Sequence, residues 1–257
     1  MGGTQEQVES HLGGSFHCSS CSNDVKFFQP LPEYYIEESK KFEFLYEFGD
    51  FETLNLAAYS CPECGASDRD RLYALYFKKH CLEKWESGER SILDFAPSQA
   101  NEKFFRSLGE VNYRTTDLMK HDVDDNGVNI ENMTLYKEGQ FDFLICSHVL
   151  EHVSNPTKAA QELHRVLKPG HTAIIMVPIM TTISETTEDP AHTTESERWK
   201  HYGQDDHVRM FSKQGFIDVL SSGGFEVNLL TESDFGSDVF AKHGIDSGSV
   251  LYTVKKY

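Results

Sequence analysis

Hydrophobic positions follow two different patterns along the chain. From residue 90 onward, short apolar runs alternate with segments whose apolar residues recur at helical spacing. Continuous apolar strands that alternate with helices are typical of a mostly parallel sheet covered on both faces. The expected strands are 92–95, 111–115, 128–130, 141–146, 172–177, 225–230 and 249–254, and the expected helices are 100–108, 157–167 and 212–222.

The N-terminal third lacks this alternation. Residues 16–65 are rich in aromatic side chains and irregular in pattern, and residues 69–85 carry a helical apolar stripe. Residues 1–15 are polar and contain glycine, which is typical of a disordered tail. We therefore expect a tail over 1–15, a small module with a docking helix over 16–89, and an α/β domain over 90–257.

Two Cys-x-x-Cys pairs lie at the ends of the aromatic region: Cys18 with Cys21, and Cys61 with Cys64. This spacing lets both sulfurs of a pair reach one tetrahedral ion, and Gly65 suits the tight turn of such a knuckle. Four thiolates leave no open coordination position, so the sequence predicts a structural zinc site. A redox pair and unrelated thiols are the alternatives.

Charge narrows the expected partners. The chain has 257 residues and a formal net charge of −17, whereas a nucleic-acid-binding protein usually presents a basic face. No apolar run approaches the ~20 residues that a membrane helix needs. The first residues also lack a basic region followed by an apolar core. We expect a cytoplasmic protein with a small-molecule partner and neither a nucleic-acid nor a membrane partner.

Several polar residues fall where expected strands end. Asp94 ends the first strand, Asp117 ends the second, and Ser147 and His148 follow the central one. Open α/β sheets bind ligands at the carboxyl ends of their strands. A carboxylate can accept hydrogen bonds from both hydroxyls of a ribose, which makes Asp117 a candidate ribose ligand. A helix cap or a turn aspartate is the alternative.

The stretch His148-Val149-Leu150-Glu151-His152 fits the His-x-x-Glu-His pattern of some zinc peptidases. That chemistry needs both histidines on one face of a helix. Here the stretch directly follows the strand 141–146 and is followed by Pro156. We favour a strand end and a short turn over a peptidase helix.

Residues 186–209 form a long polar segment with little periodicity. Such segments are usually functional lids or disordered, and the presence of Trp199 and Tyr202 favours an ordered lid. His207 and Arg209 are candidates for binding an anionic acceptor or moving a proton. A surface loop held by salt bridges is the alternative.

Five segments, taken in order, resemble class I S-adenosylmethionine-dependent methyltransferases, and more narrowly a bacterial subgroup with an N-terminal cysteine-knuckle module. They are CPECGASDRDRLYALYF (61–77), DFAPS (94–98), YRTTDL (113–118), HVLEHV (148–153) and GQDDHVRMF (203–211). The resemblance implies a Rossmann-like sheet of seven strands whose last pair is antiparallel. It also implies that the cofactor lies across the carboxyl ends of the first strands.

The resemblance assigns cofactor contacts to residues near these strand ends: Asp94, Phe95, Ala96, Pro97, Asp117, Leu118, Asn129, Ile130, Ser147, His148 and Arg71. The segment 94–97 would pass under the methionine part, Asp117 would hold the ribose, and 129–130 would flank the adenine. Either Arg69 or Arg71 would hold the cofactor carboxylate.

The first loop departs from the family, because Asp94-Phe95-Ala96-Pro97-Ser98 replaces the usual glycine-rich sequence. Since S-adenosylmethionine has no phosphate, small Ala96, rigid Pro97 and a capping Ser98 can serve instead.

The predicted function is S-adenosylmethionine-dependent methyl transfer to an oxygen or nitrogen of a small-molecule or glycan-precursor acceptor. Alignment and desolvation provide much of such catalysis, and a base removes the acceptor's proton. The candidate bases are His148 and His207, with Asp206 and Glu188 behind them. The alternatives are an RNA methyltransferase and a non-catalytic zinc-containing interaction protein.

Overall fold

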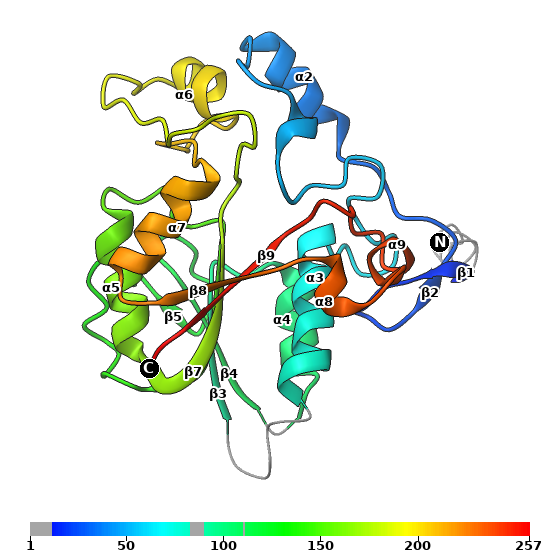
Figure 1. Cartoon of the computed structure of the whole chain (residues 1–257), viewed down its shortest axis with the longest axis horizontal. Helices are drawn as coiled ribbons and strands as arrows, with labels where there is room; N and C mark the ends of the chain where they lie inside the picture. Colours follow the sequence, from blue (N-terminus) through cyan, green and yellow to red (C-terminus); the bar gives the residue numbers. More distant parts are fainter. Residues whose placement is uncertain (1–11, 83–89, 110) are drawn as a thin grey trace.

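The computed structural model describes residues 12–82, 90–109 and 111–257. Its elements surround one large sheet (Figure 1). The strands are β1 (Leu12–His17), β2 (Asp24–Val25), β3 (Arg90–Phe95), β4 (Val111–Asp117), β5 (Asp125–Asn126), β6 (Phe141–Ser147), β7 (Leu167–Met176), β8 (Glu226–Leu230) and β9 (Leu251–Lys255). The helices are α2 (Glu33–Lys41), α3 (Asp68–Tyr76), α4 (Gln99–Arg106), α5 (Pro156–Val166), α6 (Glu195–Tyr202), α7 (Lys213–Ser222), α8 (Glu232–Phe235) and α9 (Val239–Lys242).

Seven strands form the main sheet in the order β5-β4-β3-β6-β7-β9-β8. The pairs from β5 to β7 are parallel, whereas β9 runs antiparallel to both β7 and β8. The expected Rossmann-like sheet with an antiparallel last pair is confirmed. Because β3 and β6 are neighbours and parallel, their carboxyl ends meet at one edge.

Helices cover both faces of the sheet, as the apolar pattern predicts. Figure 1 shows α5 and α7 on one side and α3 with α4 on the other. Strand β6 is buried along its first six residues because it lies at the centre of the sheet, between the two layers of helices. Each covering helix starts at a polar cap: Ser98 accepts a hydrogen bond from the Asn101 amide, and Asn155 accepts one from the Lys158 amide.

Two expectations about local structure are wrong: one strand is absent, and the boundary after the tail lies earlier in the chain. No strand forms over 128–130, and β5 lies earlier, at Asp125–Asn126. Gly127 has a φ of +70°, and the Asn129 side chain accepts a hydrogen bond from the Glu131 amide, so the chain turns where an extended strand was expected. The expected tail 1–15 also ends too late, because β1 begins at Leu12 and pairs with β2. Residues 1–11 lie outside the described residues.

The expected docking helix is α3, continued by a π-helical turn over Phe77–Cys81. Trp85, in the expected C-terminal part of this helix, lies outside the described residues. Leu72, Tyr73 and Phe77 belong to the same buried cluster as the sheet strands. At its start, α3 is capped by Ser67 and Asp70 directly after the second cysteine pair. This helix therefore joins the cysteine region, residues 18–64, to the core of the sheet domain.

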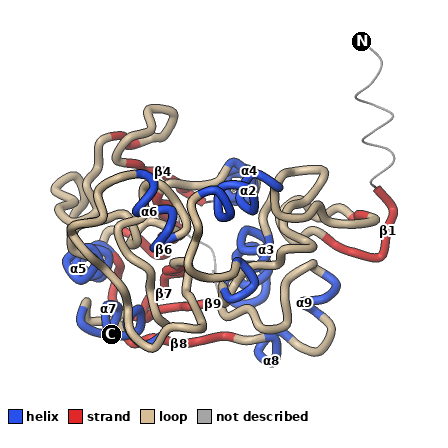
Figure 2. Tube along the Cα trace, turned by 90° about the horizontal axis from the view of Figure 1, so that it is seen from above, coloured by secondary structure: helices blue, strands red, loops and turns tan. Residues whose placement is uncertain are grey.

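The segment expected as a lid is ordered and contains α6. It lies beside α2 at one end of the molecule (Figures 1 and 2). Trp199 stacks on Phe42 with ring centroids 5.9 Å apart, and the Leu45 amide donates to the Lys200 carbonyl. The aromatic region and the lid therefore pack against each other. Among the described residues, no helix is long and apolar enough to cross a bilayer.

Candidate functional site

A cavity of about 460 Å³ opens at the carboxyl ends of β3 and β6. Its size is in the range of ligand pockets, roughly 300–1,000 Å³. The lining combines the first loop, the start of α3, the end of β6 and the lid: Tyr59, Gly65, Ser67, Arg69, Asp70, Asp94, Phe95, Ala96, Pro97, Ser98, Asn101, Lys120, Ser147, His148, His152, Gln204, Asp206 and His207. The structure thus brings together the predicted segment 94–97, Ser147, His148, Asp206 and His207.

Two lining residues have an unusual backbone. Ala96 (φ +49°) and His148 (φ +55°) both lie in the left-handed region, directly after β3 and β6. This conformation costs a non-glycine residue roughly 1–2 kcal/mol. Backbone hydrogen bonds hold it, from the Ala96 amide to Thr116 and from the His148 amide to Met176. Ala96 therefore takes a conformation that glycine usually supplies, which explains how a loop without glycine can turn here.

Asp94 is buried at the base of the cavity. Its Oδ2 accepts a hydrogen bond of 2.8 Å from the Tyr113 hydroxyl. Burial raises the pKa of Asp94 well above its usual value. Ser147 is held in a similar way, because its hydroxyl lies 2.8 Å from the Tyr73 hydroxyl.

The assignment of Arg71 to the cofactor carboxylate is wrong. Arg71 is fully buried and stacks on Phe28, with its guanidinium carbon 3.8 Å from the ring centroid. All its donor groups are taken by backbone carbonyls, which belong to Ala58, Tyr59, Ala66, His243 and Gly244. Arg69 lines the cavity instead. Arg71 therefore ties the cysteine region to the segment after α9 and is not available to a ligand.

The residues expected around ribose and adenine lie outside the lining of this cavity. Asp117 Oδ1 accepts hydrogen bonds from the Met119 and Lys120 amides, which forms a tight turn after β4. This turn presents Lys120 to the cavity. Leu118 is exposed and Ile130 is buried in the core. Cofactor contacts at Asp117, Leu118, Asn129 and Ile130 remain predictions.

A second, narrower cavity of about 80 Å³ adjoins the first. The two share five residues: Tyr59, Arg69, His148, Gln204 and His207. Most of its wall comes from the aromatic region, the end of β7 and the lid, and includes Tyr35, Phe48, Phe51, Val177, Tyr202 and Tyr252. Two compartments therefore meet at a few polar side chains.

His148 stands where the compartments meet. The Arg69 guanidinium donates to its Nε2 at 2.6 Å, and its Nδ1 lies 3.3 Å from Glu151 Oε1. Burial, and then the Arg69 charge, lower the pKa of His148 to about 4. His148 is therefore a neutral imidazole near pH 7 and can accept a proton.

The sequence alone gives Glu151 no role in the predicted site. The stretch 148–154 is a turn, as expected, and not a peptidase helix. It buries Glu151 completely among His148, His152 and His207. Burial opposes ionisation of this carboxyl, but the histidines outweigh it and lower the pKa of Glu151 to about 2. The only signal in the sequence was the His-x-x-Glu-His pattern itself.

Glu188 is not part of the site, so its assignment as a catalytic residue is wrong. Its side chain is about half exposed and pairs with Arg209 at 2.9 Å. Arg209 is buried and donates to the carbonyls of Leu150 and Val153, so it anchors the lid to the turn after β6. The expected role of Arg209 in acceptor binding is therefore replaced by a structural one.

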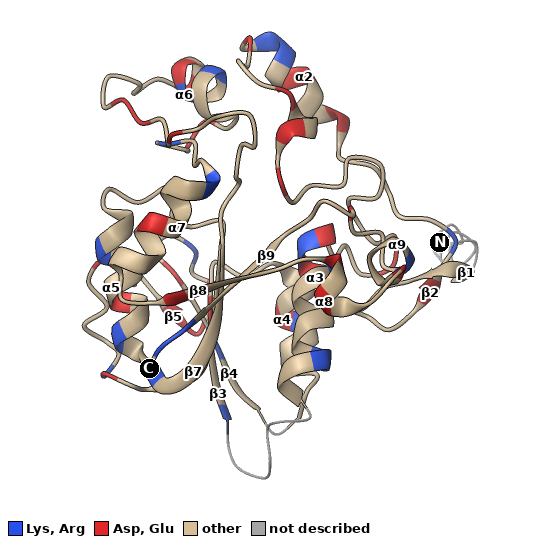
Figure 3. Cartoon of the chain, in the orientation of Figure 1, with Lys and Arg blue, Asp and Glu red and all other residues tan. Residues whose placement is uncertain are grey.

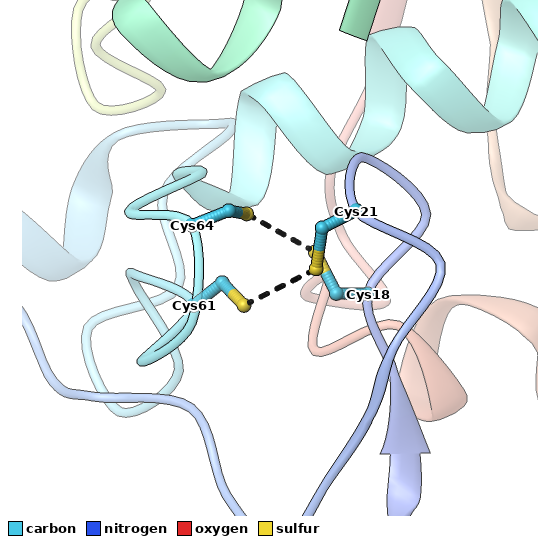
Figure 4. A group of neighbouring side chains, drawn as sticks. All are labelled: Cys18, Cys21, Cys61 and Cys64. Carbon is cyan, nitrogen blue, oxygen red and sulfur yellow. Dashed lines mark hydrogen bonds between the residues drawn. The ribbon is translucent and has the colours of Figure 1, made fainter. Parts of the chain in front are cut away.

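The four predicted zinc ligands converge (Figure 4). Their sulfur atoms all lie within 4.8 Å of one another, with 3.7 Å between Cys18 and Cys64 and 4.0 Å between Cys21 and Cys61. A tetrahedral ion with Zn–S distances of ~2.3 Å requires sulfurs about 3.8 Å apart. A disulfide needs ~2.05 Å, so the geometry fits a metal and not a disulfide.

Comparison with known proteins identifies the fold family. A family described as "Methyltransferase domain" matches residues 67–230, which is more than half of the chain. Among solved structures, the chain is similar to a SAM-dependent methyltransferase from Archaeoglobus fulgidus (15% identity, 87% of this chain and 100% of that one, TM-score 0.46). It is also similar to a SAM-dependent methyltransferase from Thermotoga maritima (18%, 74% and 98%, TM-score 0.41) and to the YcgJ protein from Bacillus subtilis (16%, 68% and 96%, TM-score 0.40).

No curated protein matches the chain. The family match includes α3, the first loop and the turn after β6, which are the elements that form the larger cavity. The family match confirms the prediction that the chain is an enzyme and not a non-catalytic protein. The chain belongs to this methyltransferase family and is a class I S-adenosylmethionine-dependent methyltransferase.

Proposed function

We propose that the enzyme methylates an oxygen or nitrogen of a small-molecule acceptor, with a saccharide-type ring as the favoured class. The observation that carries this proposal is the meeting of two compartments at Arg69, His148 and His207. The larger one would hold the cofactor and the narrower one the acceptor. A transfer reaction needs this arrangement, because alignment of the two reactants provides much of its rate enhancement.

The residues of the larger cavity fit the cofactor. S-adenosylmethionine supplies an electrophilic methyl group and carries an amino-acid end with both charges. Arg69 and Lys120 would bind its carboxylate, and Asp70 would lie near its ammonium group. Asn101 Oδ1 is buried and, among residues 12–82, 90–109 and 111–257, accepts no hydrogen bond. Because Asn101 also lines the cavity, this oxygen would accept a hydrogen bond from the ligand.

His148 would accept the acceptor's proton. Its Nε2 lone pair faces Arg69, while its Nδ1 faces Glu151. When Arg69 turns to the cofactor carboxylate, Nε2 becomes available to an acceptor hydroxyl or amine. The neutral state of His148 supports this role, and His207 lies at the same boundary as the second candidate.

The narrower cavity, of about 80 Å³, would take the part of a flat or ring-shaped acceptor that carries the reacting group. Tyr35, Phe48 and Phe51 provide aromatic walls, and Glu52 and Gln204 provide polar groups for hydroxyls. Charge favours a small molecule over RNA, because 41 acidic residues face 24 basic ones in the sequence, and residues of both signs alternate on an element such as α5 (Figure 3). A nucleic-acid interface would need a continuous basic surface.

We also propose that Cys18, Cys21, Cys61 and Cys64 bind one structural zinc ion. The sulfur distances support it. The ion would also hold the first knuckle against α3, where the Ser19 hydroxyl donates to the Arg71 carbonyl. Metal analysis of the purified chain should find one zinc equivalent that is lost in Cys61→Ser. A zinc content far below one equivalent would contradict the proposal.

The acceptor proposal is tested with a variant that fills only the narrower cavity. Leu54 lines only the narrower cavity, so Leu54→Trp would fill it with a bulky indole. Leu45→Trp is the control, because Leu45 is exposed and lines neither cavity. S-adenosylhomocysteine affinity is measured by calorimetry, and methyl transfer is measured against panels of saccharides, phenols and tRNA.

We expect Leu54→Trp to keep the parent's affinity for S-adenosylhomocysteine within about twofold and to lose most turnover of a small-molecule acceptor, while the control keeps both. Methylation of tRNA alone, or full turnover in Leu54→Trp, would contradict the proposal.

A further inference from the structure

Glu151 is a buried carboxylate without a well-aligned hydrogen bond in the described part of the chain, although His148 Nδ1 lies 3.3 Å from Oε1. Its residue exposure is 0%, and neither Oε1 nor Oε2 accepts a hydrogen bond from the described part of the chain. A buried polar group in this state costs free energy unless a cation or a proton compensates it. The groups closest to Oε1 are imidazole nitrogens of His148 at 3.3 Å, and of His152 and His207 at 3.9 Å each.

The ring orientation of His207 is fixed by its backbone contact. Its Nδ1 lies 3.1 Å from the Tyr202 carbonyl oxygen, which can only accept a hydrogen bond. The Nδ1 of His207 therefore carries the hydrogen, and in the neutral ring Nε2 carries a lone pair. This Nε2 is the atom that faces Glu151 Oε1.

His152 repeats the same arrangement. Its Nδ1 lies 3.3 Å from the Asp206 carbonyl oxygen and 3.4 Å from Asp206 Oδ2, and both atoms can only accept. The lone pair of the neutral ring is again on Nε2, which faces Glu151 Oε1. Two imidazole lone pairs and one carboxylate oxygen therefore converge, and these ligand atoms lie within 4.8 Å of one another.

We propose that Glu151, His152 and His207 form a second metal site, which binds one divalent transition-metal ion. Metal-binding histidines usually donate the other ring N–H to a carbonyl or a carboxylate, as both histidines do here. Metal–ligand distances of ~2.0–2.2 Å place ligand atoms about 3.0–3.5 Å apart. Small side-chain rotations would therefore close the observed distances of 3.9 Å.

Two imidazoles and one carboxylate suit zinc, iron, cobalt or nickel, and they leave coordination positions open. The open positions would face the two cavities, because His152 and His207 line the larger cavity and His207 also lines the narrower one. This site therefore differs in kind from the closed four-cysteine site.

If the proposed methyl transfer holds, the ion would bind the acceptor oxygen and make its hydroxyl more acidic. The hydroxyl proton would pass to Nε2 of His148, and the acceptor oxygen would use the electron pair that it keeps to form the new bond to the methyl carbon. The bond between that carbon and the cofactor sulfur would break at the same time, and S-adenosylhomocysteine would leave with the bonding pair. His207 is then a metal ligand, and His148 is left as the base.

The test uses the full chain loaded with one equivalent of zinc, which is then titrated with Co²⁺. Binding is followed by calorimetry and by visible absorbance. Cobalt bound by nitrogen and oxygen gives weak d–d bands without the intense sulfur-to-metal bands of a thiolate site. We expect one Co²⁺ equivalent, at least tenfold weaker binding in Glu151→Gln and His152→Gln, and unchanged binding in His121→Gln, whose ring lies on the surface.

His152→Gln is the decisive variant if Glu151→Gln does not fold, because the His152 side chain is about one-third exposed. S-adenosylhomocysteine affinity is measured on the same samples, so a failed metal site is distinguished from a failed cofactor site. Absence of a Co²⁺ equivalent would overturn the proposal, and so would parent-like Co²⁺ binding in His152→Gln.

Discussion

Two arginines of α3 have different roles: Arg71 is structural and Arg69 faces the cavity. The substitution Arg71→Met tests the structural role. The buried Arg71 guanidinium donates to five backbone carbonyls and stacks on Phe28. Methionine keeps most of the side-chain length but leaves these carbonyls without a donor. Removing one partner of a buried charged network costs about 3–5 kcal/mol. Since a chain of this size loses roughly 2–4 °C per kcal/mol, the midpoint of thermal unfolding should fall by about 10 °C.

The matched control is Arg69→Met, the same substitution two residues earlier. Arg69 lines both cavities and donates to His148, so its loss should change ligand binding more than stability. Urea unfolding followed by circular dichroism gives the stability, and calorimetry gives S-adenosylhomocysteine affinity. We expect Arg71→Met to lose stability with affinity unchanged in the folded fraction, and Arg69→Met to lose at least tenfold in affinity with stability within about 1 kcal/mol of the parent. The reverse pattern would refute these roles.

Three further predictions concern other parts of the chain. Burial, and then His17, lower the pKa of His243 to about 4, so the unfolded state takes up a proton below pH ~6.5 before the folded state does. The free energy of unfolding should therefore fall by about 1–3 kcal/mol from pH 6.5 to 4, and His243→Asn should flatten this slope in urea titrations; an equal slope in both proteins would contradict it. Ala96→Gly should keep the parent's affinity for S-adenosylhomocysteine. Ala96→Val should cost about 1–2 kcal/mol of stability and weaken ligand binding, because a β-branched residue resists a φ of +49°. Parent-like binding by Ala96→Val would exclude a tight approach of the loop to the ligand. Cys61→Ser should lower the midpoint of thermal unfolding along with the zinc content, and an unchanged midpoint would mean that the cysteine cluster does not stabilise the fold.

The sheet and part of the site could be predicted from sequence because they follow simple periodicity. The run Phe141–Cys146 can only be a buried strand in this context, and the parallel arrangement then brings its end next to Asp94–Pro97. No such rule chooses between Arg69 and Arg71. Both lie on α3, and only the folded position of the segment after α9 shows which one is enclosed.

Glu151 shows a second limit of sequence reasoning. A carboxylate in a turn is usually exposed, and nothing in its spacing predicts complete burial among three histidines. His207 comes from the distant lid, so this cluster exists only after the lid has packed on the turn after β6. The strand expected at 128–130 is absent for a local reason, because Val128 and Ile130 pack on the core from a turn that begins at Gly127.

The cavity at the ends of β3 and β6 is the site that we assign to the cofactor. The most direct measurement is a crystal structure of the full chain with S-adenosylhomocysteine. The expected result is ligand density in this cavity against Ala96 and Pro97, with the amino-acid carboxylate on Arg69 and the sulfur toward His148. A ligand bound elsewhere, or an empty cavity at saturating ligand, would contradict the account.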